Sequence, residues 1–255
     1  MSIKSIGYFV LPALILFLIS GCKKEDQPDP VIPQGTQFNI GVEIVSGSQL
    51  VQPGSTVYTS ESGAQFKADL IKFFLSNFSF IKSDGSEYKA GSYSLVDYSD
   101  EETRSIRFGN IPSGTYTGIK CLMGIDSTAN HTLVSNEPDL DPITGMIWSW
   151  SSGYIFYKHE GAYIDANGNE QALVYHYGQD KAVVYLEFQF SNAIEITDKT
   201  ELNAKLILDL AKVYSTPNVI DFETYNNNQS LTPADNSWIE LLKANFAQSF
   251  RLEIQ

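Results

Sequence analysis

The chain has 255 residues, of which 30 are acidic and 17 are basic, and its formal net charge at pH 7 is −13. A surface this acidic repels phosphate backbones, which argues against nucleic acid as a partner. The 14 tyrosines and 15 phenylalanines favour strands over helices.

The first 21 residues have the pattern of a lipoprotein signal peptide. Lys4 provides the positive charge at the start, and the apolar stretch 6–20 is too short to span a bilayer comfortably. Small residues, Ser20 and Gly21, then precede Cys22. This order predicts cleavage before Cys22 and attachment of lipid to its thiol. The alternative is an ordinary secretory signal followed by a chance cysteine.

Residues 22–35 read as a tether, because a short segment with three prolines and several charges buries too little apolar area to fold. Lys23–Asp26, directly after the cysteine, resembles the export tag of surface lipoproteins in Bacteroidetes-type bacteria. The same residues also fit a run of charged side chains that is simply exposed to solvent. We therefore expect an outer-membrane lipoprotein, periplasmic or surface-exposed, with a single domain at 36–255.

Alternation of apolar and polar residues predicts strands through most of that domain. The expected strands are 38–44, 66–71, 74–81, 93–97, 103–108, 116–125, 146–157, 172–177, 182–190 and 204–210. In the third of them, Phe74, Phe78 and Phe80 are expected to share one face, and in the sixth Cys121 reads as a small buried hydrophobe. Only the segment after Pro233 has helical spacing, up to Phe250. The pattern predicts an all-β sandwich with Greek-key-like connections, long loops and one peripheral C-terminal helix.

Two loops carry oxygen-rich side chains. Asp139 and Asp141 lie in the long connection 128–145, where Pro142 favours a turn over a catalytic carboxylate pair. The segment 165–170 alternates oxygen ligands, as calcium loops do, but its glycine is fourth where such a loop needs it sixth. Asn167-Gly168 between two strand patterns is more simply a hairpin turn.

No enzyme motif stands out in the sequence. There is no nucleophile elbow, phosphate-binding glycine loop or paired Cys-x-x-Cys, and His159-Glu160 lacks the second histidine of a zinc protease. Only two further histidines are present, His131 and His176. We therefore expect a protein that is not an enzyme.

A set of motifs in fixed order is similar to the MbnP-like family of periplasmic or surface proteins. The motifs run through Phe74-Leu75-Ser76-Asn77, Asp84-Gly85, Leu95-Val96-Asp97, Ile111–Tyr116, Gly124–Ser127 with Asn130, Gly145–Tyr154, Glu160-Gly161 and Tyr175-His176-Tyr177-Gly178. The resemblance spans nearly the whole domain, from about Phe38 onward.

This resemblance implies a copper site built from histidines and a tryptophan that a dihaem peroxidase-like partner oxidises to kynurenine. Carried over by position, Trp148 is the tryptophan and His176 an imidazole ligand, while His131 is a candidate replacement ligand. At two positions where members of the family have a histidine, this chain has Ile44 and Trp150. Aniline and imidazole nitrogens together suit Cu(I).

The resulting hypothesis is a membrane-anchored, non-enzymatic lipoprotein of the MbnP-like type that binds copper through oxidised Trp148 and His176. The alternative is a cell-surface module that recognises a protein or glycan without metal. That module would use the connection 128–145 and a set of tyrosines at positions 154, 157, 163, 175 and 177.

Overall fold

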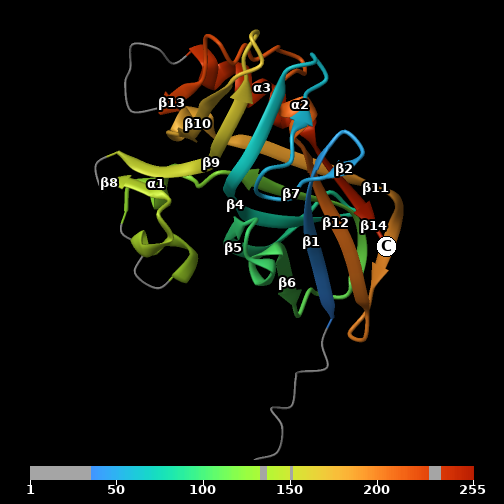
Figure 1. Ribbon diagram of the computed structural model, residues 1–255. Helices are drawn as coiled ribbons and strands as arrows, with labels where there is room; N and C mark the ends of the chain where they lie inside the picture. Colours follow the sequence, from blue (N-terminus) through green and yellow to red (C-terminus); the bar gives the residue numbers. More distant parts are fainter. Residues whose placement is uncertain (1–35, 133–136, 150–151, 230–236) are drawn as a thin grey trace, which may run out of the picture. The chain divides into compact units, whose positions relative to one another are not determined.

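The computed structural model describes residues 36–132, 137–149, 152–229 and 237–255 (Figure 1). The signal peptide, Cys22, the tether and Trp150 therefore lie outside the described residues. In the described part of the chain, no helix is both long and apolar enough to cross a membrane.

A nine-stranded sheet is built around one long strand, β4 (Gln65–Lys82). Its main path runs β11-β7-β4-β9-β10-β13, with β3 and β5 paired to β4 and β8 paired to β9. The bounds are β3 Tyr58–Thr59, β5 Glu87–Asp97, β7 Gly114–Met123, β8 Ile147–Ser149, β9 Gly153–Ile164, β10 Glu170–Gly178, β11 Val184–Ile196 and β13 Asn227–Gln229.

A five-stranded sheet has the strand order β14-β12-β1-β2, and β6 also pairs with β1. Its strands are β1 Gln37–Ser46, β2 Gln49–Leu50, β6 Ser105–Gly109, β12 Glu201–Asp209 and β14 Phe250–Ile254. β1 and β12 are parallel, although they lie at opposite ends of the domain sequence. The first and last parts of the domain thus hold each other in one sheet.

Helices are few and short among the described residues. They are α1 Ser127–Asn130, α2 Leu210–Val213 and α3 Ser237–Ser249, with 3-10 helices at Glu101–Arg104, Pro138–Leu140, Pro142–Thr144 and Asp180–Ala182. α3 buries Trp238, Leu242 and Phe246, and it is the one substantial helix that the spacing predicted.

Aromatic side chains from both sheets meet in the core. Phe38 of β1 and Phe108 of β6 each pack on Phe80 of β4, with ring centroids 5.1 and 5.5 Å apart. Phe250 of β14 packs on Phe73 of β4 at 6.1 Å. Buried aromatic pairs in edge-on geometry add stabilisation beyond the area they bury. The two sheets therefore face each other across an aromatic core, which confirms the expected all-β, sandwich-like fold.

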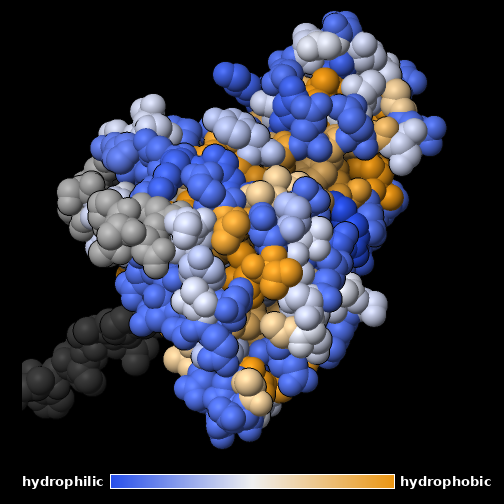
Figure 2. Space-filling view, turned by 90° about the horizontal axis from the view of Figure 1, so that it is seen from above, coloured by the Kyte–Doolittle hydropathy of each residue, from blue (hydrophilic) through white to orange (hydrophobic). Residues whose placement is uncertain are grey.

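The outer surface is mostly hydrophilic in the view of Figure 2, with hydrophobic residues in separate patches. The most exposed large apolar side chains come from different elements, among them Ile143 and Tyr185. By contrast, the tyrosines expected to suit a recognition surface are all buried, at positions 154, 157, 163, 175 and 177. That expectation was wrong, because strand alternation turns these rings toward packed surfaces and away from solvent.

Four further expectations are corrected. The strands 66–71 and 74–81 are one strand, β4, with a register shift around Asn77, whose φ is 54°. Beyond that irregularity the faces change: Phe74 contacts Tyr154, whereas Phe78 and Phe80 pack on Phe108. The expected strand 146–157 is a pair of strands, β8 and β9, and Phe250 begins β14 after α3 ends.

Two local predictions are confirmed. Cys121 is buried, and burial raises the pKa of its thiol to about 12, so it is an inert core residue. Of the segment 165–170, residues 165–169 form the turn between β9 and β10, and Glu170 begins β10. There the Asp165 carboxylate accepts hydrogen bonds from the backbone N–H groups of Asn167 and Asn169, and it is a turn residue rather than part of an oxygen cage.

Candidate site at Trp148 and His176

His176 lies on the outer face of β10, since Tyr175 and Tyr177 on either side of it are directed into the core. Its Nε2 is 2.8 Å from Glu160 Oε1, and its side chain is 15% exposed. Glu160 also pairs with Lys158, whose Nζ is 3.2 Å from the same oxygen. Burial opposes ionisation of Glu160, but these contacts outweigh it, and the pKa of the carboxyl is lowered.

The Glu160 contact has a consequence for metal chemistry. Histidines that bind metals commonly donate one ring N–H to a carboxylate, which fixes the tautomer and makes the other nitrogen a better ligand. The His176–Glu160 pair has this arrangement. The pairing is set by hairpin register, because β9 and β10 place Lys158 opposite His176 and Glu160 on its diagonal.

Trp148 lies against the same strand. It belongs to β8, which pairs with the start of β9, and a Cβ added to Gly178 would lie 2.8 Å from two carbons of the indole six-membered ring. The same Cβ would lie 2.5 Å from the Tyr154 carbonyl oxygen, so only glycine allows this close packing. Gly178 is two residues beyond His176. Trp148 thus packs on β10 two residues along the strand from His176.

The indole nitrogen of Trp148 is unusual. Nε1 is buried, and it has no hydrogen-bond partner among the described residues. A buried polar group without a partner costs about 1–3 kcal/mol, so such groups call for an explanation.

His131 is held elsewhere by a hydrogen-bonding contact with Asp180. Its Nε2 is 3.1 Å from both oxygens of Asp180, and its side chain is about half exposed. Asp180 also accepts from Ser127 and Asn130, and these contacts keep its pKa low although partial burial opposes ionisation. The structure therefore gives His131 a role in fastening α1 to the segment after β10.

The third histidine, His159, has 0% exposure and points into the core, with Nδ1 on the Tyr214 hydroxyl and Nε2 on the Lys67 carbonyl. Both ring nitrogens are occupied by protein groups. Of the three histidines, His176 is the one on β10, two residues from the Gly178 against which Trp148 packs.

Asn130 secures the hairpin that carries Trp148. Its Oδ1 accepts from the Tyr154 N–H at 2.8 Å, and its Nδ2 donates to Asp180 at 2.7 Å. The fit is close, because a Cβ on Gly153 would lie 2.4 Å from Asn130 Oδ1.

Asn130→Ala should therefore lower the free energy of unfolding by about 1–3 kcal/mol, since it leaves the buried Tyr154 N–H without an acceptor. Urea unfolding monitored by circular dichroism measures the change. Asn192→Ala, at an exposed position on β11, is the matched control and should stay within about 0.5 kcal/mol of wild type. Equal stabilities for the two variants would contradict this role.

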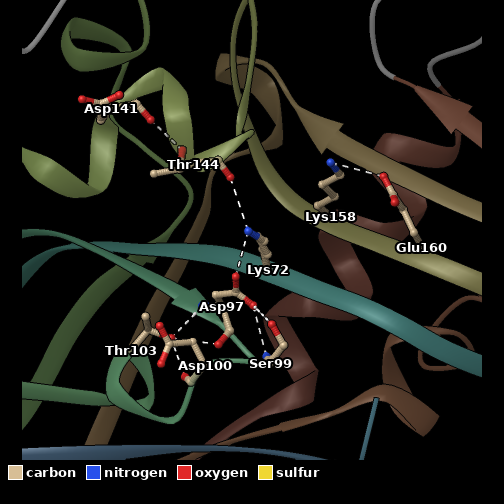
Figure 3. A network of polar contacts seen from close by, with 9 residues as sticks. All are labelled: Lys72, Asp97, Ser99, Asp100, Thr103, Asp141, Thr144, Lys158 and Glu160. Atoms are coloured by element: carbon tan, nitrogen blue, oxygen red, sulfur yellow. Dashed lines mark hydrogen bonds and ion pairs between the residues drawn. The ribbon is translucent and has the colours of Figure 1, made fainter. Parts of the chain in front are cut away.

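A polar network holds the 138–145 segment over the sheet (Figure 3). Lys72 of β4 donates to Asp97 at 2.8 Å and to the Thr144 carbonyl at 3.4 Å. Asp141 caps the 3-10 helix at Pro142–Thr144 through the Ile143 N–H, and Asp139 accepts from the Leu95 N–H. Both aspartates are thus turn and loop residues, as predicted.

The donors near Trp148 limit what the site can bind. Within the described residues, no three His, Cys, Asp or Glu side chains form a group that could hold a metal ion. One imidazole and one orphaned, buried nitrogen do not make the four-ligand shell of structural zinc. They fit a metal that accepts few nitrogen ligands, as Cu(I) does.

Glu160, Asn130 and Asp180 were not assigned to the site from sequence. Glu160 could have been identified from the sequence, because the Asn167-Gly168 turn fixes which residues of the two strands face each other. Asn130 and Asp180 are brought together by loops, and no periodic pattern marks them.

The chain is similar to known proteins of one family. The family model of MbnP matches residues 35–233. The search of curated proteins gave no match. A solved structure of MbnP from Methylosinus trichosporium superposes with a TM-score of 0.53 at 13% identity, covering 86% of this chain and 98% of that one. At this identity the structural likeness supports the fold.

Proposed function

The chain belongs to the MbnP family, a family associated with copper binding, and from this membership we propose that it binds copper itself. The ligands are His176 and the nitrogen of Trp148 after oxidation of that tryptophan to kynurenine. The protein acts as a non-enzymatic binder, and it is held at the outer membrane by lipid on Cys22.

The observation that carries the proposal is the orphaned Nε1 of Trp148. Oxidation to kynurenine breaks the C2–C3 bond of the indole, each of these carbons takes up one oxygen, and hydrolysis releases C2 as formate. Nε1 stays on the benzene ring and becomes an aniline nitrogen. The atom that would become the ligand is therefore one of three buried side-chain atoms that have no hydrogen-bond partner among the described residues.

His176, two residues from Gly178 on β10, also supports the proposal. Its hydrogen bond to Glu160 provides the carboxylate support typical of metal-binding imidazoles. Cu(I), when bound, would be a soft metal ion that accepts few nitrogen ligands, and the chain would hold those nitrogens in position.

Export and modification are parts of the same proposal. The signal pattern and the small residues before Cys22 support lipid anchoring, periplasmic or surface-exposed. A dihaem peroxidase-like enzyme is the proposed oxidant, with peroxide or dioxygen supplying the oxygen atoms. Neither step needs a catalytic group from this chain.

The test is peptide mass mapping and copper analysis of protein purified from its own host. We expect residue 148 to gain one oxygen and lose one carbon, with copper in the same sample. Trp238, buried in α3, is the internal control and should stay unmodified. Unmodified Trp148 and no copper, from cells that contain the oxidising partner, would overturn the proposal in favour of a metal-free interaction module.

A further inference from the structure

A buried cluster of titratable side chains takes no part in the proposed copper site. It consists of Tyr157 and His159 on β9 and Tyr214 directly after α2, and all three side chains have 0% exposure. The Tyr157 and Tyr214 hydroxyl oxygens are 3.0 Å apart, and the Tyr214 hydroxyl is bonded to His159 Nδ1. Phe66 and Phe222 pack edge-on against Tyr214 and close the cluster from water.

The hydrogen-bond partners fix the direction of every proton in the cluster. His159 Nε2 faces the Lys67 carbonyl at 3.1 Å, and a carbonyl can only accept, so Nε2 carries the proton. Nδ1 then holds the lone pair and accepts the O–H of Tyr214. The Tyr214 oxygen is left to accept the O–H of Tyr157.

The imidazole is neutral under physiological conditions. Burial lowers the pKa of His159 to about 4, and burial raises the pKa of Tyr214 well above its usual value. Tyr214 is therefore a phenol hydrogen-bonded to a neutral base in a dry core.

This pairing sets Tyr214 apart from other buried tyrosines. Tyr116, Tyr154, Tyr175 and Tyr177 donate to backbone carbonyls, which cannot take up a proton. Tyr93 and Tyr163 pair with the carboxylates of Asp126 and Glu223, neither of which is buried, whereas the partner of Tyr214 lies in the core.

A row of oxidisable rings leads away from the cluster. Tyr175 lies 5.7 Å from Tyr214 between ring centroids, Trp238 lies 5.9 Å from Tyr175, and Tyr177 lies 6.2 Å from Trp238. Tyr177 immediately precedes Gly178, the residue against which Trp148 packs. An electron can thus leave Tyr214 through aromatic neighbours toward the surface that carries Trp148.

We propose that Tyr214 is a redox-active tyrosine with His159 as its proton acceptor. Tyr214 gives one electron to an external, high-potential one-electron oxidant, and its phenolic proton moves to His159 Nδ1. The products are a neutral tyrosyl radical, an imidazolium ion and the reduced oxidant. Because the proton moves within the existing hydrogen bond, oxidation does not leave a charged phenol radical cation in the core. When the radical is reduced, the proton returns to Tyr214.

The inference goes beyond copper binding and does not rest on it, so the test uses the metal-free, unmodified domain. Photo-oxidised ruthenium tris-bipyridine supplies the oxidant, and electron paramagnetic resonance detects the radical. A neutral tyrosyl signal should form in wild type and persist in Tyr116→Phe, which removes a buried hydroxyl that has only a carbonyl partner. The signal should be lost in Tyr214→Phe.

The same measurements can overturn the assignment of Tyr214. A signal of wild-type size in Tyr214→Phe, no signal in wild type, or equal loss in Tyr116→Phe would each refute the assignment. Should Tyr214→Phe fail to fold, wild type labelled with 15N-histidine replaces it. The tyrosyl radical should then show an exchangeable proton shared with a labelled imidazole, and absence of that coupling refutes the pair.

Discussion

Cu(I) affinity should fall by about 100-fold or more in His176→Ala, because even the loss of a group that only supports a ligand costs about 10–100-fold. The substitution removes the one imidazole that is proposed as a copper ligand, on the strand that packs against Trp148. Competition with a chromogenic Cu(I) chelator, under anaerobic conditions and on protein modified at Trp148, measures the change.

Two variants make this result specific. His131→Ala removes an imidazole of the same chemistry that pairs with Asp180, and it should leave copper affinity unchanged. Glu160→Gln keeps the ligand but weakens its support, and it should lower affinity by about 10-fold to 100-fold. Equal affinities for wild type and His176→Ala would remove His176 from the site.

Acid should destabilise the fold by about 3 kcal/mol through His159 alone. The pKa of this imidazole is about 4 in the folded protein, against an ordinary value of 6.5. Between these values the unfolded chain binds a proton that the folded chain does not. The contribution of His159 to the free energy of unfolding is therefore complete above pH 6.5, falls as pH drops toward 4, and levels off below.

Urea unfolding at several pH values between 7.5 and 4.5 measures this loss. His159→Gln is the comparison, since glutamine does not titrate and its amide can still bond to the Lys67 carbonyl and the Tyr214 hydroxyl. The variant should be less stable at pH 7.5 but should show a flatter dependence on pH. Identical slopes for the two proteins would show that His159 charges freely in the fold.

The sequence was a good guide to the strands. In β1 the alternation of apolar and polar residues gave the correct strand and the correct inner face, because one side of the strand packs on the core, and in β10 it gave the correct strand. The Asn167-Gly168 turn and the buried Cys121 followed from local chemistry in the same way.

Other features depend on contacts between distant segments. Asn77, with a φ of 54°, interrupts the register of β4, and no residue pattern shows which face continues beyond it. Phe250 fits a helical spacing, yet it pairs with Leu208 of β12 as the first residue of β14. Pairing with a neighbouring strand overrides local periodicity at such positions.

The residues of the candidate site also divide into those that the sequence indicated and those that it did not. Trp148 and His176 were named from motif positions, and the structure adds the contact through Gly178 that relates them. The attachment of His131 to Asp180 could not be foreseen, because both lie in connections whose positions are fixed by tertiary packing. His159 was read only as part of an incomplete motif, whereas its two hydrogen bonds make it the centre of a buried network.

The central claim is that copper lies between residue 148 and His176. The most direct measurement is anomalous diffraction at the copper edge from crystals of the modified, copper-loaded domain. We predict one strong peak, in contact with the nitrogen of residue 148 and a ring nitrogen of His176. A peak at His131 and Asp180, or no peak in a protein shown to carry kynurenine at residue 148, would contradict the account.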